Sequence, residues 1–314
     1  MPYINVDEVY ILDNTGLQVD MATDIPFADA GFTDTQQAQA RKNIAAGGTN
    51  PNLLDNPWFT VNQRGVTTLS SAAFPADRWG NGLNTTTSTT SDGVSITNND
   101  SVRRSFNQNF VMPWLVGKTC TASVMLQDGT IYSGTITFPS SGTSDFVTFD
   151  GTSIRATYGA SYLSVGLMVA AGATVALRAF KLELGSVSTL ANDVPPDYGT
   201  ELAKCQYYCR NFAAIGSTIM YIGGGFANST TQARFEVPVS MRAITSTPTV
   251  TTTGSIEVLC NGTWYAVTGM SSTWATNNNT GIALFATVSS GLTQNAPCVL
   301  RINNNASLLY SVDL

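Results

Sequence analysis

The sequence contains few charged residues and no histidine. Charged side chains make up 11% of the 314 residues, against roughly 25% in an ordinary soluble domain. The absence of histidine excludes Ser-His-Asp and Cys-His nucleophilic catalysis, zinc sites that need imidazole, and a histidine pH switch. The formal net charge of −6 argues against a nucleic-acid partner, because such a partner requires a basic surface.

Long apolar runs and paired cysteine motifs are also missing. No stretch reaches the roughly 18 to 20 apolar residues of a membrane span, and residues 1–20 lack the basic and apolar regions of a signal peptide. We therefore expect no membrane insertion. The 5 cysteines, an odd number without CxxC spacing, predict buried free thiols in a protein made in a reducing cytoplasm, and they predict no metal site.

The N-terminus carries most of the charge that is present. Residues 1–48 hold seven acidic and two basic side chains, so we predict that residues 1–50 form a separate attachment arm. Its short apolar runs at 9–12 and 16–19 are compatible with a hairpin, a strand added to a partner, or a docking arm. Residues 33–46 predict a short helix, with Gly47-Gly48 at its end. Because so short a helix with few large apolar side chains is unstable alone, we expect it to trimerise the chain.

From Asn52 onward the pattern is that of short strands. β-Branched and aromatic runs alternate with Gly-containing turns, which predicts an antiparallel jelly-roll-like β-sandwich over residues 51–195. The runs are 121–126, 132–138, 146–149, 163–169 and 173–184. A Thr/Ser/Asn-rich segment at 84–99 predicts a surface loop or an edge hairpin.

The segment 196–314 predicts a linking helix and a second β domain. Residues 200–212 follow Pro195-Pro196 and carry an apolar stripe, which suits either a trimer seam or a helix packed on a sheet. The stripe consists of Leu202, Cys205, Cys209 and Phe212. The strand-like runs beyond it predict a C-terminal β-sandwich knob. The runs are 219–222, 233–239, 247–253, 255–259, 263–267, 282–288, 298–302 and 308–314. The triplet 223–225, all glycine, predicts a bulge or a tight turn.

Several motifs resemble one family of proteins. The segment TDTQQAQARKNIAAGG (33–48) resembles a recurrent segment of bacteriophage and prophage tail fibres. The pair NLLDNPWFTVNQRG (52–65) and AFPADRW (73–79) is similar to β-sandwich modules of phage tail and receptor-binding proteins. The segments at 180–212, 235–251 and 307–314 resemble the closing strand, the following helix and the terminal knob of these modules.

The resemblance implies a mainly β homotrimeric fibre in the virion, assembled in the host cytoplasm. Its N-terminus would attach to a phage tail or baseplate protein, and its C-terminal tip would bind a bacterial surface receptor. A glycan is the expected receptor, since a trimer presents several weak sugar sites together.

Aromatic and amide side chains in the presumed tip are the candidate glycan site, because sugars bind aromatic faces flanked by amides and hydroxyls. The candidates are Trp264, Tyr265, Trp274, Asn277, Asn278 and Asn304. Trp58 and Trp79 lie within the family motif, and we expect them to pack in the sandwich core beside structural Arg/Asp pairs. Trp114 is compatible with a core or a surface position.

The carboxylates form no recognisable catalytic pair in the sequence. Beyond Tyr198 they are Glu201, Glu236, Glu257 and Asp313, whereas a glycan depolymerase needs two carboxyl groups within roughly 5–10 Å. We therefore predict a receptor-binding protein that is not an enzyme and uses no cofactor. The alternatives are a structural virion component, such as a head fibre, neck or baseplate decoration, and a polysaccharide depolymerase.

Overall fold

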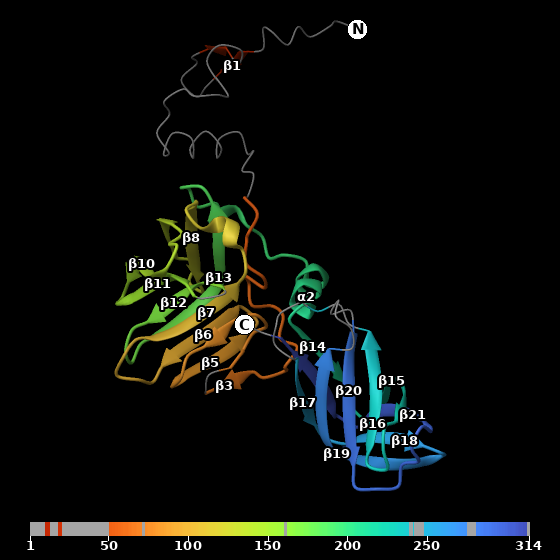
Figure 1. Cartoon of the computed structure of the whole chain (residues 1–314). Helices are drawn as coiled ribbons and strands as arrows, with labels where there is room; N and C mark the ends of the chain where they lie inside the picture. The colour runs from red at the N-terminus through yellow and green to blue at the C-terminus, as the bar shows by residue number, and fades with distance from the viewer. Residues whose placement is uncertain are drawn as a thin grey trace, which may run out of the picture. The chain divides into compact units, whose positions relative to one another are not determined.

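A computed structural model of the chain describes residues 10–12, 18–20, 50–70, 73–159, 162–238, 241, 248–274 and 281–312. The chain divides into two compact units, Met1–Gly48 and Thr49–Leu314 (Figure 1). The predicted helix over 33–46 lies outside the described residues, as do Asn277, Asn278 and Asp313.

The N-terminal unit contains one described pair of strands. β1 (Tyr10–Leu12) and β2 (Gln18–Asp20) are antiparallel, with Ile11 opposite Val19. Of the three arrangements that the sequence allowed for these apolar runs, the pairing agrees with the hairpin.

Two antiparallel sheets form the first part of the larger unit. The five-stranded sheet has the order β10-β11-β12-β7-β4, and the six-stranded sheet has the order β3-β5-β6-β13-β8-β9. The strands of the first are β4 (Gly80–Asn81), β7 (Arg104–Phe110), β10 (Gly142–Phe149), β11 (Thr152–Tyr158) and β12 (Leu163–Val169). Those of the second are β3 (Thr68–Leu69), β5 (Thr85–Thr90), β6 (Gly93–Asn98), β8 (Thr119–Leu126), β9 (Ile131–Thr137) and β13 (Thr174–Leu184). The Thr/Ser/Asn-rich segment supplies the β5–β6 hairpin, which confirms the hairpin alternative.

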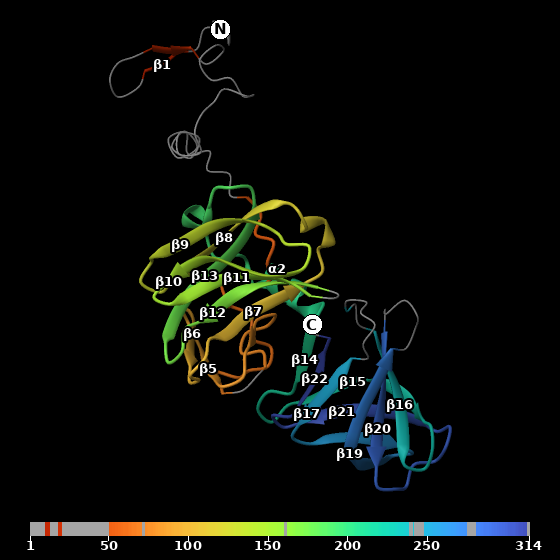
Figure 2. The same ribbon diagram turned by 60° about the vertical axis from the view of Figure 1, so that its left-hand side comes forward.

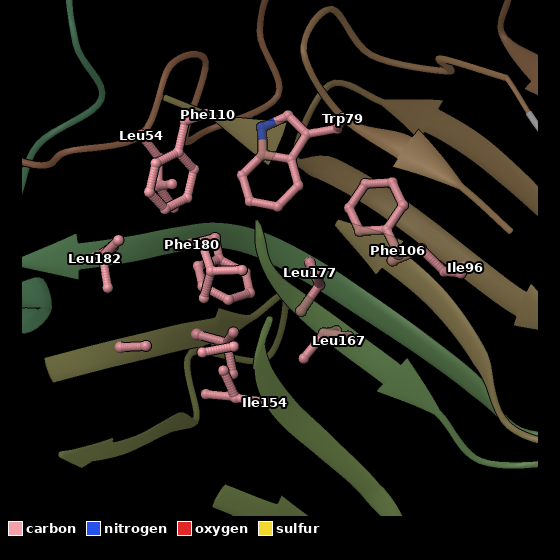
Figure 3. Packing of buried hydrophobic residues seen from close by; sticks show 14 of the residues in the cluster. Leu54, Trp79, Ile96, Phe106, Phe110, Ile154, Leu167, Leu177, Phe180 and Leu182 are labelled. Carbon is pink, nitrogen blue, oxygen red and sulfur yellow. The ribbon is translucent and has the colours of Figure 1, made fainter. Parts of the chain in front are cut away.

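One hydrophobic core lies between these sheets, with Trp79 inside it (Figure 3). The Trp79 ring is fully buried and stacks on Phe106 at 5.4 Å between ring centroids. On its other side it contacts Phe180 of β13 at 5.2 Å. The indole Nε1 donates to the Asn56 carbonyl at 2.9 Å, so its polar atom is paired despite burial. The predicted core position of Trp79 is therefore confirmed, while Trp58 is half-buried.

The linking helix is shorter than the sequence predicted. α2 spans Tyr198–Gln206, and the Asp197 side chain caps it by accepting from the Thr200 amide at 2.9 Å. The expectation of a helix to residue 212 is wrong, because β14 (Cys209–Ala213) pairs instead with β22 (Ser307–Ser311). The backbone ladder with β22 overrides local helix propensity, so Cys209 and Phe212 belong to a strand and the four-residue stripe does not exist.

The C-terminal strands close into a barrel, where the sequence predicted a two-sheet sandwich (Figure 2). The barrel has the order β15-β16-β20-β19-β18-β21, and β15 pairs with both β16 and β21. The strands are β15 (Ile219–Ala227), β16 (Gln232–Pro238), β18 (Ile256–Cys260), β19 (Thr263–Trp274), β20 (Gly281–Val288) and β21 (Pro297–Asn303). A separate three-stranded sheet has the order β14-β22-β17, with β17 at Thr249–Thr253.

Two β-bulges accompany closure of the barrel. The pairing of β15 with β21 shifts register between Tyr221 and Gly223, so a bulge, one of the two alternatives for the glycine triplet, lies directly before the triplet, whose own residues pair in register. The pairing of β19 with β20 shifts between Val267 and Gly269. Bulges bend a strand and increase its twist, and closing a sheet requires such bending.

The cysteines are buried and free, as the sequence predicted. Among the residues that the structure describes, no helix is both long and apolar enough to cross a membrane.

Candidate functional site

Four strands bring a group of outward-facing side chains together on the barrel. Along β18, Ile256, Val258 and Cys260 are buried inside the barrel, and the residues between them face outward. Strand pairing then sets Glu257 beside Arg301 of β21, and Arg301 beside Tyr221 of β15. We call this group, together with Trp264 of β19, the barrel wall. Its members are Tyr221, Glu257, Trp264 and Arg301.

Arg301 is the centre of the barrel wall. Its guanidinium lies 3.5 Å from the centroid of the Trp264 ring, which is the geometry of a cation–π contact. The same group donates from Nε and Nη2 to one oxygen of Glu257, at 2.8 and 2.6 Å. The Asn303 amide donates to that oxygen as well, at 2.5 Å. Since the arginine is held from two sides, it fixes the orientation of the indole against the barrel.

Tyr221 extends the aromatic surface beyond Trp264. The two ring centroids are 6.5 Å apart and the rings are inclined by 44°. Tyr221 is 61% exposed and Trp264 is partly exposed. An exposed aromatic surface beside a guanidinium and a carboxylate offers both an apolar face and hydrogen-bonding groups to a ligand.

The electrostatics of the wall keep Glu257 ionised. Partial burial acts to raise the pKa of this carboxyl, but the hydrogen bonds from Arg301 and Asn303 outweigh it, so the pKa lies below its usual value. A general acid in glycoside hydrolysis needs the opposite shift. The arrangement of Glu257 is therefore that of an ion-pair partner that orients Arg301.

The structure separates the residues that the sequence grouped into one site. Trp264 faces outward, whereas Tyr265 and Trp274 pack against the hydrophobic core of the barrel. Adjacent residues of a strand point to opposite faces, which accounts for Tyr265. The bulge after Val267 reverses the alternation further along β19, so Trp274 faces inward although an even number of residues separates it from Trp264.

Asn304 belongs to a turn and not to a strand of the barrel wall. It occupies the exposed turn between β21 and β22, with φ of 38°, and its backbone N–H donates to the Thr218 carbonyl at 3.1 Å. Asparagine tolerates this left-handed backbone conformation better than most residues. The side-chain amide of Asn303, one residue earlier, donates to Glu257 of the barrel wall.

Sequence reasoning missed Tyr221, Glu257 and Arg301. They come from strands that are far apart in the chain, and the pairing of β15, β21 and β18 is what joins them. The period-two pattern of β18 could have identified Glu257 as an outward position. No signal in the sequence gives the register that places it beside Arg301.

The Arg/Asp groups of the family-like motif are structural pairs, as predicted. Arg78 is 1% exposed, donates to Asp55 at 3.2 Å, and lies 3.3 Å from the Tyr208 ring centroid. Arg64 pairs with Asp77 at 3.4 Å. These contacts tie the first core to the segment that follows α2. Trp114, for which the sequence left two positions open, is 51% exposed.

The fold and the barrel wall define a mainly β protein with a closed barrel that exposes aromatic side chains. In the part of the chain that the structure describes, no three His, Cys, Asp or Glu side chains gather in a way that could hold a metal ion. Comparisons with protein-family models, with curated proteins and with solved structures find no match in any of the three.

Proposed function

We propose that this protein is a phage tail fibre or receptor-binding protein that attaches the virion to a glycan on the bacterial surface. The barrel, as the C-terminal knob, carries the glycan site, and the sheets before it form a jelly-roll-like neck. The N-terminal segment joins a tail or baseplate protein, and three copies form the fibre. The motif resemblance supports a place in the phage virion, and the exposed aromatic side chains of the barrel wall support binding of a glycan.

The observation that carries the proposal is the preorganised stack of Trp264 on Arg301 beside the exposed Tyr221 ring. A sugar ring presents an apolar C–H face and polar hydroxyl edges. An exposed aromatic ring matches the former, and the guanidinium and carboxylate beside it match the latter. Because the salt bridge fixes these groups before the ligand arrives, binding costs little side-chain entropy.

The test is binding of the full-length protein to an array of purified bacterial surface polysaccharides. We expect Trp264→Ala to weaken binding about 30-fold, the effect of a 2 kcal/mol hot spot. Trp114→Ala is the matched control, because it removes an exposed tryptophan of the other part of the unit. Unchanged affinity of the Trp264 variant, with an unchanged melting temperature, would contradict a glycan site on the barrel wall.

A second candidate function is a structural virion component without receptor contact. The observation that favours it is the apolar outer side of β15, where Ile219 is 48% exposed and Phe226 is 42% exposed. These two side chains lie near opposite ends of β15, and exposed apolar side chains suit contact with another subunit. In that case the array shows no binding, and Ile219→Ser together with Phe226→Ser lowers the mass of the assembly in sedimentation.

A further inference from the structure

A hollow lies on the outer face of the five-stranded sheet, far in sequence from the barrel wall. It has a volume of about 330 Å³ and is lined by side chains of β7, β11 and β12. This volume falls within the range of roughly 300–1,000 Å³ seen for small-molecule sites. We call it the sheet groove. The lining residues used below are Asn107, Asn109, Arg155, Thr157, Tyr162 and Ser164.

Strand register arranges the polar side chains of the groove in two rows. The rows are Arg155, Gly166 and Asn107, and then Thr157, Ser164 and Asn109. The residues between them in sequence, such as Ala156, Val165 and Phe106, are buried in the core on the other face. The polar rows are therefore held by a packed sheet rather than by loops, which gives a site precise geometry.

Gly166 keeps the centre of the groove open. A Cβ at this position would lie 2.4 Å from the Asn107 Cα and 2.2 Å from the Phe106 carbonyl oxygen. Because the β7 backbone leaves no room for a side chain at position 166, the middle of the first row carries none and is hollow.

The floor of the groove consists of neutral hydrogen-bonding groups. The Asn107 amide donates to Asn109 Oδ1 at 2.8 Å and to Ser164 Oγ at 2.9 Å. Amides and hydroxyls both donate and accept, as sugar hydroxyls do. The core of a protein–protein interface is enriched in aromatic and apolar side chains instead, so this lining favours a saccharide over a second protein chain.

An aromatic ring stands at the rim. Tyr162 is 38% exposed and lines the same hollow. It can cover the apolar face of a sugar ring whose hydroxyl edges point to the floor.

One end of the groove carries a positive charge. Arg103 and Arg155 share one carboxylate, Asp145, at 3.0 and 2.5 Å, so these three groups sum to +1. Among the described residues, Nη1 of Arg155 has no hydrogen-bond partner. A guanidinium with a free donor suits a carboxylate or phosphate group of a ligand.

We propose that the sheet groove binds a saccharide segment that carries an acidic group. The sugar hydroxyls occupy the two polar rows, Tyr162 covers the ring, and the acidic group pairs with Arg155. The proposal shares with the proposed function the class of target, a surface glycan, but it uses no residue of the barrel wall.

The experiment measures calorimetric binding of the full-length protein to oligosaccharides from acidic capsular polysaccharides and to their carboxyl-reduced neutral forms. Fragments of wall teichoic acid supply phosphate in place of carboxylate. We expect Asn107→Ala and Tyr162→Ala each to weaken binding of the acidic fragments at least about tenfold. The matched controls are Asn99→Ala and Tyr198→Ala, which truncate exposed residues elsewhere and are expected to change nothing. Carboxyl reduction should lower the affinity of the wild type for the ligand by a similar factor.

The outcomes separate the groove from the barrel wall. Loss of binding in the groove variants but not in Trp264→Ala supports the groove and contradicts the barrel site. Loss in Trp264→Ala alone overturns the groove and leaves the proposed function standing. Equal affinity for acidic and neutral fragments also overturns the groove proposal, as does a groove variant that lowers the oligomer mass without changing affinity.

Discussion

The barrel wall and the sheet groove are two different ways of building a polar–aromatic surface on β structure. The wall exposes aromatic rings fixed by an ion pair, and its shape depends on side chains such as Arg301 and Trp264. The groove is hollow because the backbones of β7 and β12 approach closely at Gly166. Substitutions should therefore affect the wall through lost contacts and the groove through displaced backbone.

The largest effect that this comparison predicts is that of Gly166→Ala. The added methyl group collides with backbone atoms of β7. We therefore expect the free energy of unfolding, measured by urea denaturation, to fall by about 1–3 kcal/mol. Gly80→Ala in the same sheet is the control, because its nearest neighbour would lie 3.5 Å away. If both variants are equally stable, the groove does not depend on the close approach at Gly166.

The corresponding test of the barrel wall is the stability of the Arg301→Lys variant, measured by urea denaturation. Lysine keeps the charge but loses the second hydrogen bond to Glu257 and the planar stack on Trp264. We therefore expect the free energy of unfolding to fall by about 1 kcal/mol. Arg234→Lys is the control, because Arg234 makes a single hydrogen bond to the exposed Glu236 and its guanidinium lies farther from a ring, 6.0 Å from the Phe285 centroid. A loss for Arg301→Lys no larger than for the control would mean that the wall is not held by its arginine.

Acid should weaken both regions. Hydrogen bonds, first from Arg155, hold the pKa of Asp145 below its usual value, and the pKa of Glu257 is lowered as well. A lowered folded-state pKa means that the stabilisation is complete above the unfolded value of about 4 and is lost as the pH falls through the folded value. Unfolding free energies measured between about pH 2 and about pH 6 should therefore depend less on pH in Asp145→Asn and Glu257→Gln. An unchanged pH dependence in either variant would show that its carboxylate is not paired in solution.

The smallest expected effect is the labelling of the buried thiols. It tests whether the barrel opens locally more often than the core between the two sheets. Burial raises the pKa of Cys120, between the two sheets, to about 11. Burial and a hydrogen bond with Cys260 raise that of Cys298, in the barrel, to about 12. At about pH 8 iodoacetamide should label neither residue in the folded protein, since thiolate is the reactive form. Intact mass spectrometry checks this, and selective labelling of Cys298 would show that the barrel opens locally.

The sequence predicted the mainly β class from its strand-like patterning and the buried thiols from the number and spacing of the cysteines. The core position of Trp79 was expected from the family-like motif in which it lies. The sequence did not predict barrel closure or the end of α2 at Gln206, since both depend on which distant strand pairs with which. Of the barrel wall, the sequence singled out one residue. Trp264 could be selected as an aromatic in the last β domain, but the bulge after Val267 that turns Trp274 inward leaves no signal in residue type.

The sheet groove shows a different limit of sequence reasoning. Asn107, Thr157 and Ser164 occupy alternate positions of strands, where any solvent-facing side chain would also be polar. Only the register that aligns them, and the glycine between Arg155 and Asn107, distinguishes them from an ordinary exposed face.

The pairing of β14 with β22 also has a mechanical consequence. The chain enters the barrel region along β14, whose hydrogen bonds to β22 extend from Cys209 opposite Ser311 to Ala213 opposite Ser307. β22 pairs in turn with β17, and the Val312 amide donates to the Tyr208 carbonyl at 2.7 Å. Tension applied between the preceding sheets and the barrel wall pulls β14 lengthwise, so that its hydrogen bonds with β22 are loaded together in shear rather than opened one after another. If the barrel binds a surface as proposed, the short sheet of β14, β22 and β17 is the element that resists its separation from the preceding sheets.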